Sequence, residues 1–248
     1  MSFDPDSIIT SSEQLAELYR APSPLVAAKK AGVLDDASIG MLERSPFVLI
    51  ATSGDDGSLD VSPRGGPAGF VRVLDEQHVA IPDLNGNNLI DSLRGVVANG
   101  RAGLLVLVPG KDETLRLNGE AWVVTDPSVL DRWDGELRRP TTAIVIRTDE
   151  VFMHCAKAFR RSNLWDPASW EALADAPDGL DVLQAQGLVA TNDAATREFL
   201  EQAYAADLAH DAPECSARDG PRPLVRGSGR PSRLGLRPVC SHQGHGAG

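Results

Sequence analysis

The sequence predicts a mainly β (α+β) protein, built on a barrel of six to seven mostly antiparallel strands with an inserted helix and flanking helices. Short β-rich segments follow one another through the middle of the chain, and turns rich in Gly and Asp separate them. A single helical pattern interrupts these segments, and further helical patterns stand at both ends. We therefore expect a helical segment at residues 1–45, a barrel at 46–166, C-terminal helices at 167–211 and a tail at 212–248.

The strand predictions rest on composition and period. FVLIATS is apolar and β-rich, and the turn GDDGS joins it to SLDVS as a first hairpin. RAGLLVLV is apolar enough for a strand that is buried on both faces, whereas TLRLNGEAWVV alternates between apolar and polar positions. The other segments predict a second hairpin and one or two late strands. These predicted strands cover Phe47–Ser53, Gly69–Leu74, His78–Ile81, Arg101–Val108, Thr114–Val124 and Thr142–Cys155.

The helices are predicted from apolar positions on one face and from capping residues. Ser11 or Ser12 caps the first helix, SEQLAELYR, and Pro22 and Pro24 break it. The helix inserted in the barrel runs from about Asn88 to Asn99 and stops at Gly100. The remaining predicted helices cover Ala37–Arg44, Pro167–Ala174, Leu180–Gln186 and Ala194–Ala209.

Composition limits the classes of function. The 248-residue chain carries a net charge of −11, which argues against general binding to nucleic acid or to anionic membranes. No apolar run of membrane-spanning length occurs, and the acidic N-terminus does not resemble a signal peptide. Cys155, Cys215 and Cys240 form neither a disulfide framework nor a metal-binding pattern. We expect a cytoplasmic protein without a metal site.

The tail differs from the rest of the chain. Residues 212–248 hold six Arg and no Lys, together with seven Gly and five Pro. Such a mixture cannot bury a core and predicts disorder. Three interpretations stay open: a tail without function, a basic tail that docks on the acidic body, and a reading frame altered near its end.

One polar corner of the predicted barrel suits a phosphate-bearing ligand. Arg64 follows a strand and precedes a Gly-Gly pair, which allows a ligand close to the backbone. Asn87 and Asn88 open the inserted helix, whose free N–H groups and positive dipole end attract anions. The alternatives are a solvated turn arginine and two plain helix caps.

A series of motifs then carries a family resemblance. From about Pro46 to Pro167 the chain contains, in order, FVLIATSGDDGSLDVSPRG, GFVRV, AIPD followed by GNN, IDSLR, LLVLVPG, ETLRLNG and CAKAFRRSNLWDP. Through them it resembles the FMN-binding split barrels of the pyridoxamine 5'-phosphate oxidase-like family, and most of all a bacterial subgroup of probable FMN-dependent enzymes. The resemblance implies a split barrel, a homodimer, and FMN bound in the groove between the two subunits.

The resemblance also implies site residues, position by position. The residues that it implies for phosphate binding are Ser62, Arg64, Asn87 and Asn88. The flavin ring is expected to lie along the backbone of Val61, Ser62, Pro63, Ile81, Pro82 and Asp83. Candidates contributed across the dimer are Thr114, Arg116, Lys157, Arg160, Arg161 and Trp165, of which the last four are also candidates for substrate contacts. The oxidases of the family carry Ser-Arg-Lys where this chain has Gly86-Asn87-Asn88, and Arg94 is a candidate to compensate.

The expected function is an FMN-dependent oxidoreductase that moves hydride or electrons between a reduced donor, such as a nicotinamide nucleotide, and a small-molecule substrate. Flavin chemistry needs no acid–base pair from the chain, so no catalytic residue is assigned. The alternative is a non-enzymatic flavin, deazaflavin or tetrapyrrole-binding protein on the same fold. A haem would need an axial ligand, for which His78 and His154 are the candidates in the body of the chain.

Overall fold

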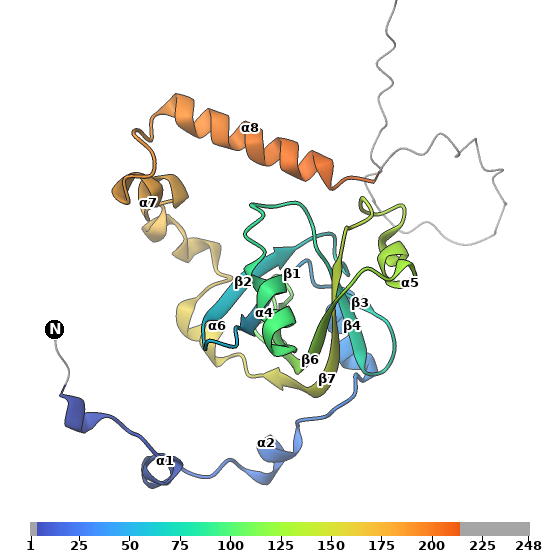
Figure 1. The fold of residues 1–248 in the computed structure, drawn as a ribbon. Coiled ribbons are helices and arrows are strands. Elements are labelled where there is room, and N and C mark those ends of the chain that lie inside the picture. Colours follow the sequence, from blue (N-terminus) through green and yellow to red (C-terminus); the bar gives the residue numbers. More distant parts are fainter. Residues whose placement is uncertain (1–3, 214–248) are drawn as a thin grey trace, which may run out of the picture.

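A computed structural model describes residues 4–213 as one curved, seven-stranded antiparallel sheet with helices around it (Figure 1). The strands follow the spatial order β2-β1-β5-β6-β7-β4-β3, so β2 and β3 are the edges and the barrel is not closed. The predicted mainly β fold with an inserted helix is therefore confirmed. The strands are β1 (Phe47–Ser53), β2 (Leu59–Gly65), β3 (Arg72–Val73), β4 (His78–Pro82), β5 (Arg101–Leu107), β6 (Thr114–Val124) and β7 (Ala143–His154).

The main core lies inside the curve of the sheet. Alternate residues of β1, β5 and β6 point into it, as the period of two in a β-strand requires. Val48, Ile50, Val106, Leu115 and Leu117 have no exposed surface. Burial of such side chains supplies most of the favourable free energy of folding, at about 25 cal/mol per Å² of apolar surface.

Helix α4 (Asp91–Asn99) connects β4 to β5 and packs against β1, β2 and β6. Val96 is buried on its inner side, and Gly95 lies so close to β1 that an added Cβ would meet the Thr52 hydroxyl at 2.5 Å. Gly100 ends the helix in the left-handed conformation, with φ of 69°, as the sequence predicts. Helix α4 thereby fixes the edge strand β2 on the rest of the barrel.

A second apolar cluster stands behind β4 and β7. Trp133 is fully buried there among Leu130, Leu137, Ala143 and Val145, and its indole Nε1 donates to the backbone oxygen of Phe70 at 2.7 Å. Helix α5 (Pro127–Leu130) and the 3-10 turn η2 (Asp131–Trp133) carry this cluster and were not predicted.

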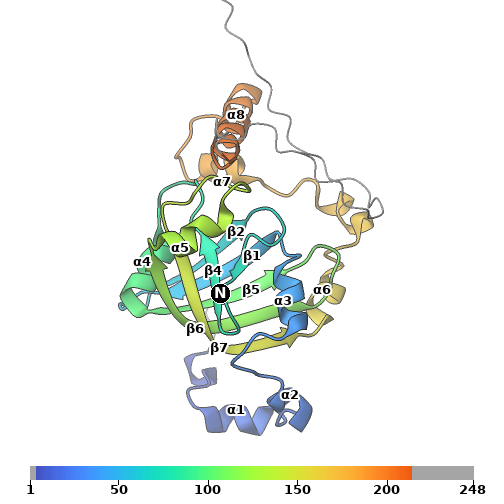
Figure 2. The same ribbon diagram turned by 90° about the vertical axis from the view of Figure 1, so that its right-hand side faces the viewer.

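The N-terminal helices are η1 (Pro5–Ser7), α1 (Ser12–Leu18), α2 (Pro24–Ala28) and α3 (Asp36–Leu42). Ser11 caps α1 in a capping box with Gln14, as the sequence predicts for Ser11 or Ser12. Figure 2 shows α3 at the barrel, whereas α1 and α2 stand away from it. Helix α2 was not predicted: Pro24 occupies its first turn, where proline is tolerated, instead of breaking a helix.

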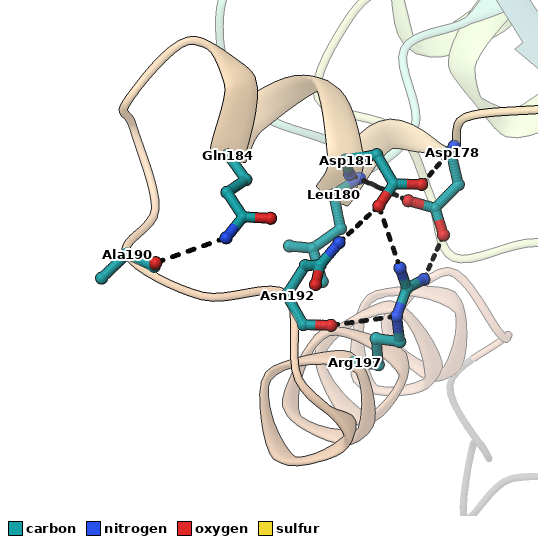
Figure 3. Close-up of polar contacts among 7 residues, drawn as sticks. All are labelled: Asp178, Leu180, Asp181, Gln184, Ala190, Asn192 and Arg197. Carbon is teal, nitrogen blue, oxygen red and sulfur yellow. Dashed lines mark hydrogen bonds and ion pairs between the residues drawn. The ribbon is translucent and has the colours of Figure 1, made fainter.

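After the barrel come α6 (Lys157–Ser162), the 3-10 turns η3 (Pro167–Ser169) and η4 (Glu171–Leu173), α7 (Gly179–Ala185) and α8 (Ala194–His210). In both ribbon views α8 lies on the opposite side of the barrel from α1 and α2 (Figures 1 and 2). Arg197 joins α8 to α7 by ion pairs with Asp178 and Asp181, and its Nε donates to the backbone oxygen of Asn192 (Figure 3).

Four details of the sequence prediction were wrong. The inserted helix begins at Asp91 instead of Asn88, because the preceding residues form a loop. Residues 167–174 form two 3-10 turns instead of one helix, and the expected strand Gly69–Leu74 shrinks to two residues. Strand β5 is fully buried on one face only: Ala102, Leu104 and Val106 are buried, whereas the residues of the other face are half-buried or exposed.

Part of the prediction lies beyond the described residues. The predicted tail is outside them from residue 214 on, together with Cys215 and Cys240, and Cys155 is an exposed free thiol. Between residues 4 and 213, no helix combines the length and the apolar character needed to cross a bilayer.

Candidate functional site

A cavity of about 530 Å³ opens between β2, the end of β4, the loop before α4 and the end of α8. This volume lies in the range typical of small-molecule sites. Its lining brings together seven of the residues predicted for the cofactor: Ser62, Pro63, Arg64, Pro82, Asp83, Asn87 and Asn88.

Arg64 lies within β2 and not in a turn after the strand, so this part of the sequence prediction was wrong. Its guanidinium is held by two hydrogen bonds, from Nη1 to the Pro63 backbone oxygen at 2.8 Å and from Nη2 to the Ser92 hydroxyl at 2.9 Å. Ser92, in the first turn of α4, is fully buried and donates to the Asp60 carboxylate at 2.5 Å. The arginine is therefore an oriented group at the cavity and not a freely solvated turn residue.

The loop before α4 has a strained backbone. Asn88 and Ile90 have φ of 58° and 52°, in the left-handed region that a β-branched residue such as Ile rarely adopts. Asn87 stabilises the loop, because its Oδ1 accepts a hydrogen bond from the backbone N–H of Leu89 at 3.1 Å. Strain of this kind persists where the surroundings impose it, and it concentrates at functional sites.

Asp83 lies half-buried on the wall of the cavity, directly after β4. Burial raises the pKa of its carboxyl above the ordinary 3.8, and the positive charge of Arg64 opposes this rise. The carboxylate is thus half-buried and close enough to Arg64 to interact with its charge. A ligand in this cavity therefore meets one cation together with one acid.

The C-terminal end of α8 forms a further wall. Leu208 and Asp211 line the cavity. The backbone N–H of Asn85 donates to the Asp211 carboxylate at 3.0 Å, and the Asn85 side chain donates to Asp207 at 2.9 Å. Residues more than 120 positions apart in sequence thus close one side of the site, a contribution that no local sequence pattern predicts.

Five predicted cofactor residues lie outside the lining: Val61, Ile81, Arg94 and, on β6, Thr114 and Arg116. Val61 points to the opposite face of β2 from Ser62 and is 65% exposed, whereas Ile81 is 2% exposed and belongs to the main core. Arg94 lies over a separate depression beside the GDDGS turn and pairs with Asp91 at 3.6 Å. In this chain Arg94 therefore does not extend the positive charge of Arg64.

Thr114 and Arg116 occupy β6, away from the cavity. Thr114 is buried, and the Arg116 guanidinium carbon lies 5.5 Å from the centre of the Phe152 ring. Nearby, burial lowers the pKa of His154, and the charges of Arg116 and Lys29 lower it further. His78 pairs with Asp75 at a hairpin turn, so neither histidine lines the cavity.

The four late candidates cluster on and after α6, at a distance from the cavity in this chain. Arg160 pairs with Asp112 at 2.9 Å. Trp165 stacks on Phe159 with ring centres 5.6 Å apart, and its Nε1 donates to the backbone oxygen of Lys111. Lys157 and Arg161 are exposed. The structure thus brings the predicted phosphate residues together in one chain and leaves the predicted second-subunit residues apart from them.

Comparison with known proteins places the barrel in a family. Residues 34–155 match the family model described as pyridoxamine 5'-phosphate oxidase, and this part of the chain belongs to that family. No curated protein matches the chain.

Solved structures resemble about half of the chain at low identity. HupZ of Group A Streptococcus is 13% identical with a TM-score of 0.41, covering 48% of this chain and 93% of its own. A putative pyridoxamine 5'-phosphate oxidase from Lactobacillus delbrueckii is 20% identical with a TM-score of 0.40, covering 50% of this chain and 98% of its own. An FAD-binding protein from Mycobacterium smegmatis is 14% identical with a TM-score of 0.35, covering 50% and 97%.

Proposed function

We propose that the chain binds FMN in the cavity beside β2 and acts as an FMN-dependent oxidoreductase on a small-molecule substrate. Family membership supports a flavin ligand. The observation that carries the proposal is the oriented Arg64 guanidinium, held at the wall of a cavity of ligand size. Bound flavin would supply hydride or electron-pair transfer, and the chain would bind and orient it.

The lining fits a single phosphate group. Arg64 offers a charged, forked donor, and the side-chain amides of Asn87 and Asn88 add neutral donors from the same wall. An added Cβ at Gly86 would meet no atom within 4 Å, which leaves open space beside these amides. The phosphate would be bound by one cation together with neutral hydrogen-bond donors, which favours moderate affinity.

We further propose that the protein is a homodimer. The outer face of the sheet, which points away from the main core on β2, β1 and β5, carries exposed apolar side chains in the part of the chain that the structure describes. Leu59 is 84% exposed, Val61 65% and Phe47 37%. Adjacent exposed apolar side chains of this kind mark an interaction surface. Strand β2 carries this face on one side and the cavity residues Ser62 and Arg64 on the other, so a second copy would pack against the strand that holds the proposed ligand site. The family resemblance, which implies Arg116 and Lys157 as second-subunit residues, agrees with such a dimer.

A tetrapyrrole in the same cavity has less support. Haem iron takes an axial His, Cys, Met or Tyr, and none of these residue types lines the described cavity.

Flavin binding without turnover differs from the proposed enzyme in one measurable respect, which is whether a nicotinamide nucleotide or another donor bleaches the bound flavin.

The test compares two arginines. Arg64→Ala removes the oriented guanidinium, whereas Arg94→Ala removes an exposed arginine over the neighbouring depression and serves as the matched control. We expect Arg64→Ala to weaken FMN binding at least tenfold in a titration of flavin fluorescence, which corresponds to about 1.4 kcal/mol. We expect Arg94→Ala to change it less than threefold. Equal affinities for wild type and Arg64→Ala would overturn the proposed site.

A further inference from the structure

Asp60 was not among the predicted site residues, yet it contacts two of the groups that form the site. It lies on β2 two positions before Ser62 and four before Arg64, so the three side chains share one face of the strand. One carboxylate oxygen accepts from the Ser62 hydroxyl at 2.8 Å, and the other accepts from the Ser92 hydroxyl at 2.5 Å.

These contacts decide where each hydroxyl proton goes. A serine hydroxyl has one proton and two acceptor sites. Ser92 gives its proton to Asp60, so its free lone pairs face the Arg64 Nη2, which donates to it at 2.9 Å. Ser62 also gives its proton to Asp60 and is left as an acceptor toward the cavity. Asp60 thereby sets the direction of the guanidinium through Ser92.

We propose that Asp60 is a positioning residue of the phosphate site, holding Arg64 in its binding direction through the buried hydroxyl of Ser92. The inference deepens the proposed FMN function and rests on it. It also assigns Ser62 to an acceptor role, suited to a ligand hydroxyl such as those of the ribityl chain and unsuited to the phosphate oxygens.

Charge alone predicts the opposite effect of Asp60. A carboxylate close to a dianionic phosphate repels it, so removing the charge would tighten FMN binding if repulsion were the larger effect. Positioning predicts weaker binding, because an arginine without a fixed partner loses direction and must be ordered when the ligand binds. The sign of the change in FMN affinity therefore separates the two roles.

The experiment measures the affinities of FMN and riboflavin in parallel, since the two ligands differ only in the phosphate. In wild type we expect FMN to bind more tightly than riboflavin. Asp60→Asn keeps the size of the side chain. We expect it to lower the FMN-to-riboflavin affinity ratio about tenfold, while the affinity for riboflavin changes less than threefold. Asp55→Asn removes one exposed acid of the GDDGS turn and serves as the control, with an unchanged ratio expected.

Ser92→Ala removes the hydroxyl that connects Asp60 to Arg64, so the inference is tested by a second variant as well. We expect Ser92→Ala to lower the FMN-to-riboflavin affinity ratio by the same factor as Asp60→Asn. The double variant should show no further decrease, because both changes act on one contact. An unchanged or raised ratio in Asp60→Asn would overturn the inference and leave FMN binding standing. A wild-type protein that binds FMN no better than riboflavin would overturn the phosphate site itself, and the inference with it. Unfolding midpoints verify that each variant is folded.

Discussion

The backbone N–H of Asn85 donates to the Asp211 carboxylate at 3.0 Å, and this bond fastens the end of α8 to the wall of the cavity. Asp207 accepts from the Asn85 side chain one helical turn earlier. No residue of α8 is buried, so these polar contacts hold its C-terminal end against the barrel. A third bond, from the backbone N–H of Arg138 to the backbone oxygen of Asp211 at 2.8 Å, adds to them. The C-terminal end of α8 thus covers one side of the site through polar contacts.

Replacing Asp211 tests this cover. Asp211→Ala removes the acceptor of the Asn85 N–H, and we expect the amide of Asn85 to exchange with solvent about three- to tenfold faster, measured by hydrogen exchange. This expected change in exchange rate corresponds to the loss of one partly exposed hydrogen bond to a charged group, whose strength solvent screening reduces. Glu201→Ala, at an exposed position of the same helix, is the control. Unchanged exchange in Asp211→Ala would show that other contacts hold the cover.

The proposed dimer is tested on the outer face. Val61→Lys places a charge on an apolar patch that the second copy would cover, and we expect the variant to sediment as a monomer where wild type sediments as a dimer. Leu188→Lys changes a leucine of similar exposure, 68% against 65%, in the loop after α7, and should leave the dimer intact. A dimeric Val61→Lys variant, or a monomeric wild type, would refute the proposed interface.

Gly119 tests the pairing of the two longest strands. It lies at the register shift between β6 and β7, and an added Cβ would stand 1.8 Å from the backbone oxygen of Arg147. Because a backbone atom cannot move aside cheaply, we expect Gly119→Ala to lower the free energy of unfolding by about 3 kcal/mol. Gly179→Ala, where the added Cβ would meet no atom within 4 Å, should change it by less than about 0.5 kcal/mol. Chemical denaturation measures both, and equal stabilities would contradict the geometry.

Asp83 predicts a pH dependence of stability. Its folded pKa is raised, so the folded state holds the proton more tightly than the unfolded state does, and stability falls as the pH rises from about 3.8 through the folded pKa. We therefore expect Asp83→Asn to be more stable than wild type at neutral pH and to lose this advantage below pH 4. Arg64→Ala should raise the Asp83 pKa further. A stability difference that does not vary with pH would rule out this explanation.

The sequence predicted the architecture well, because the strands carry strong local signals. Alternation in β6, the apolar run of β5 and Gly100 at the end of α4 are properties of short segments. The two strands and the helix end were confirmed, although β5 is fully buried on one face and not on both. The start of α4 was predicted three residues early. An Ile in the left-handed conformation at position 90 is imposed by tertiary contacts and leaves no signal in the local sequence.

The cavity was predictable only in part. Arg64, Asn87 and Asn88 are polar residues at a recognisable corner, and the structure places them together. Asp60 and Ser92 lie 32 positions apart, and their contact depends on the packing of α4 against β2, which no local pattern reports. Asp211 was not predicted for the same reason: its contact with Asn85 depends on how the end of the C-terminal helices packs against the barrel.

The most direct test of the central claim is the visible absorption spectrum of the purified full-length protein, with the ligand identified after release by heat and with added FMN titrated into any colourless preparation. We predict oxidised-flavin bands and released FMN, or saturable binding of added FMN that Arg64→Ala abolishes. A protein that carries no flavin and binds none when FMN is added would contradict the proposed function, while the fold and the family would stand.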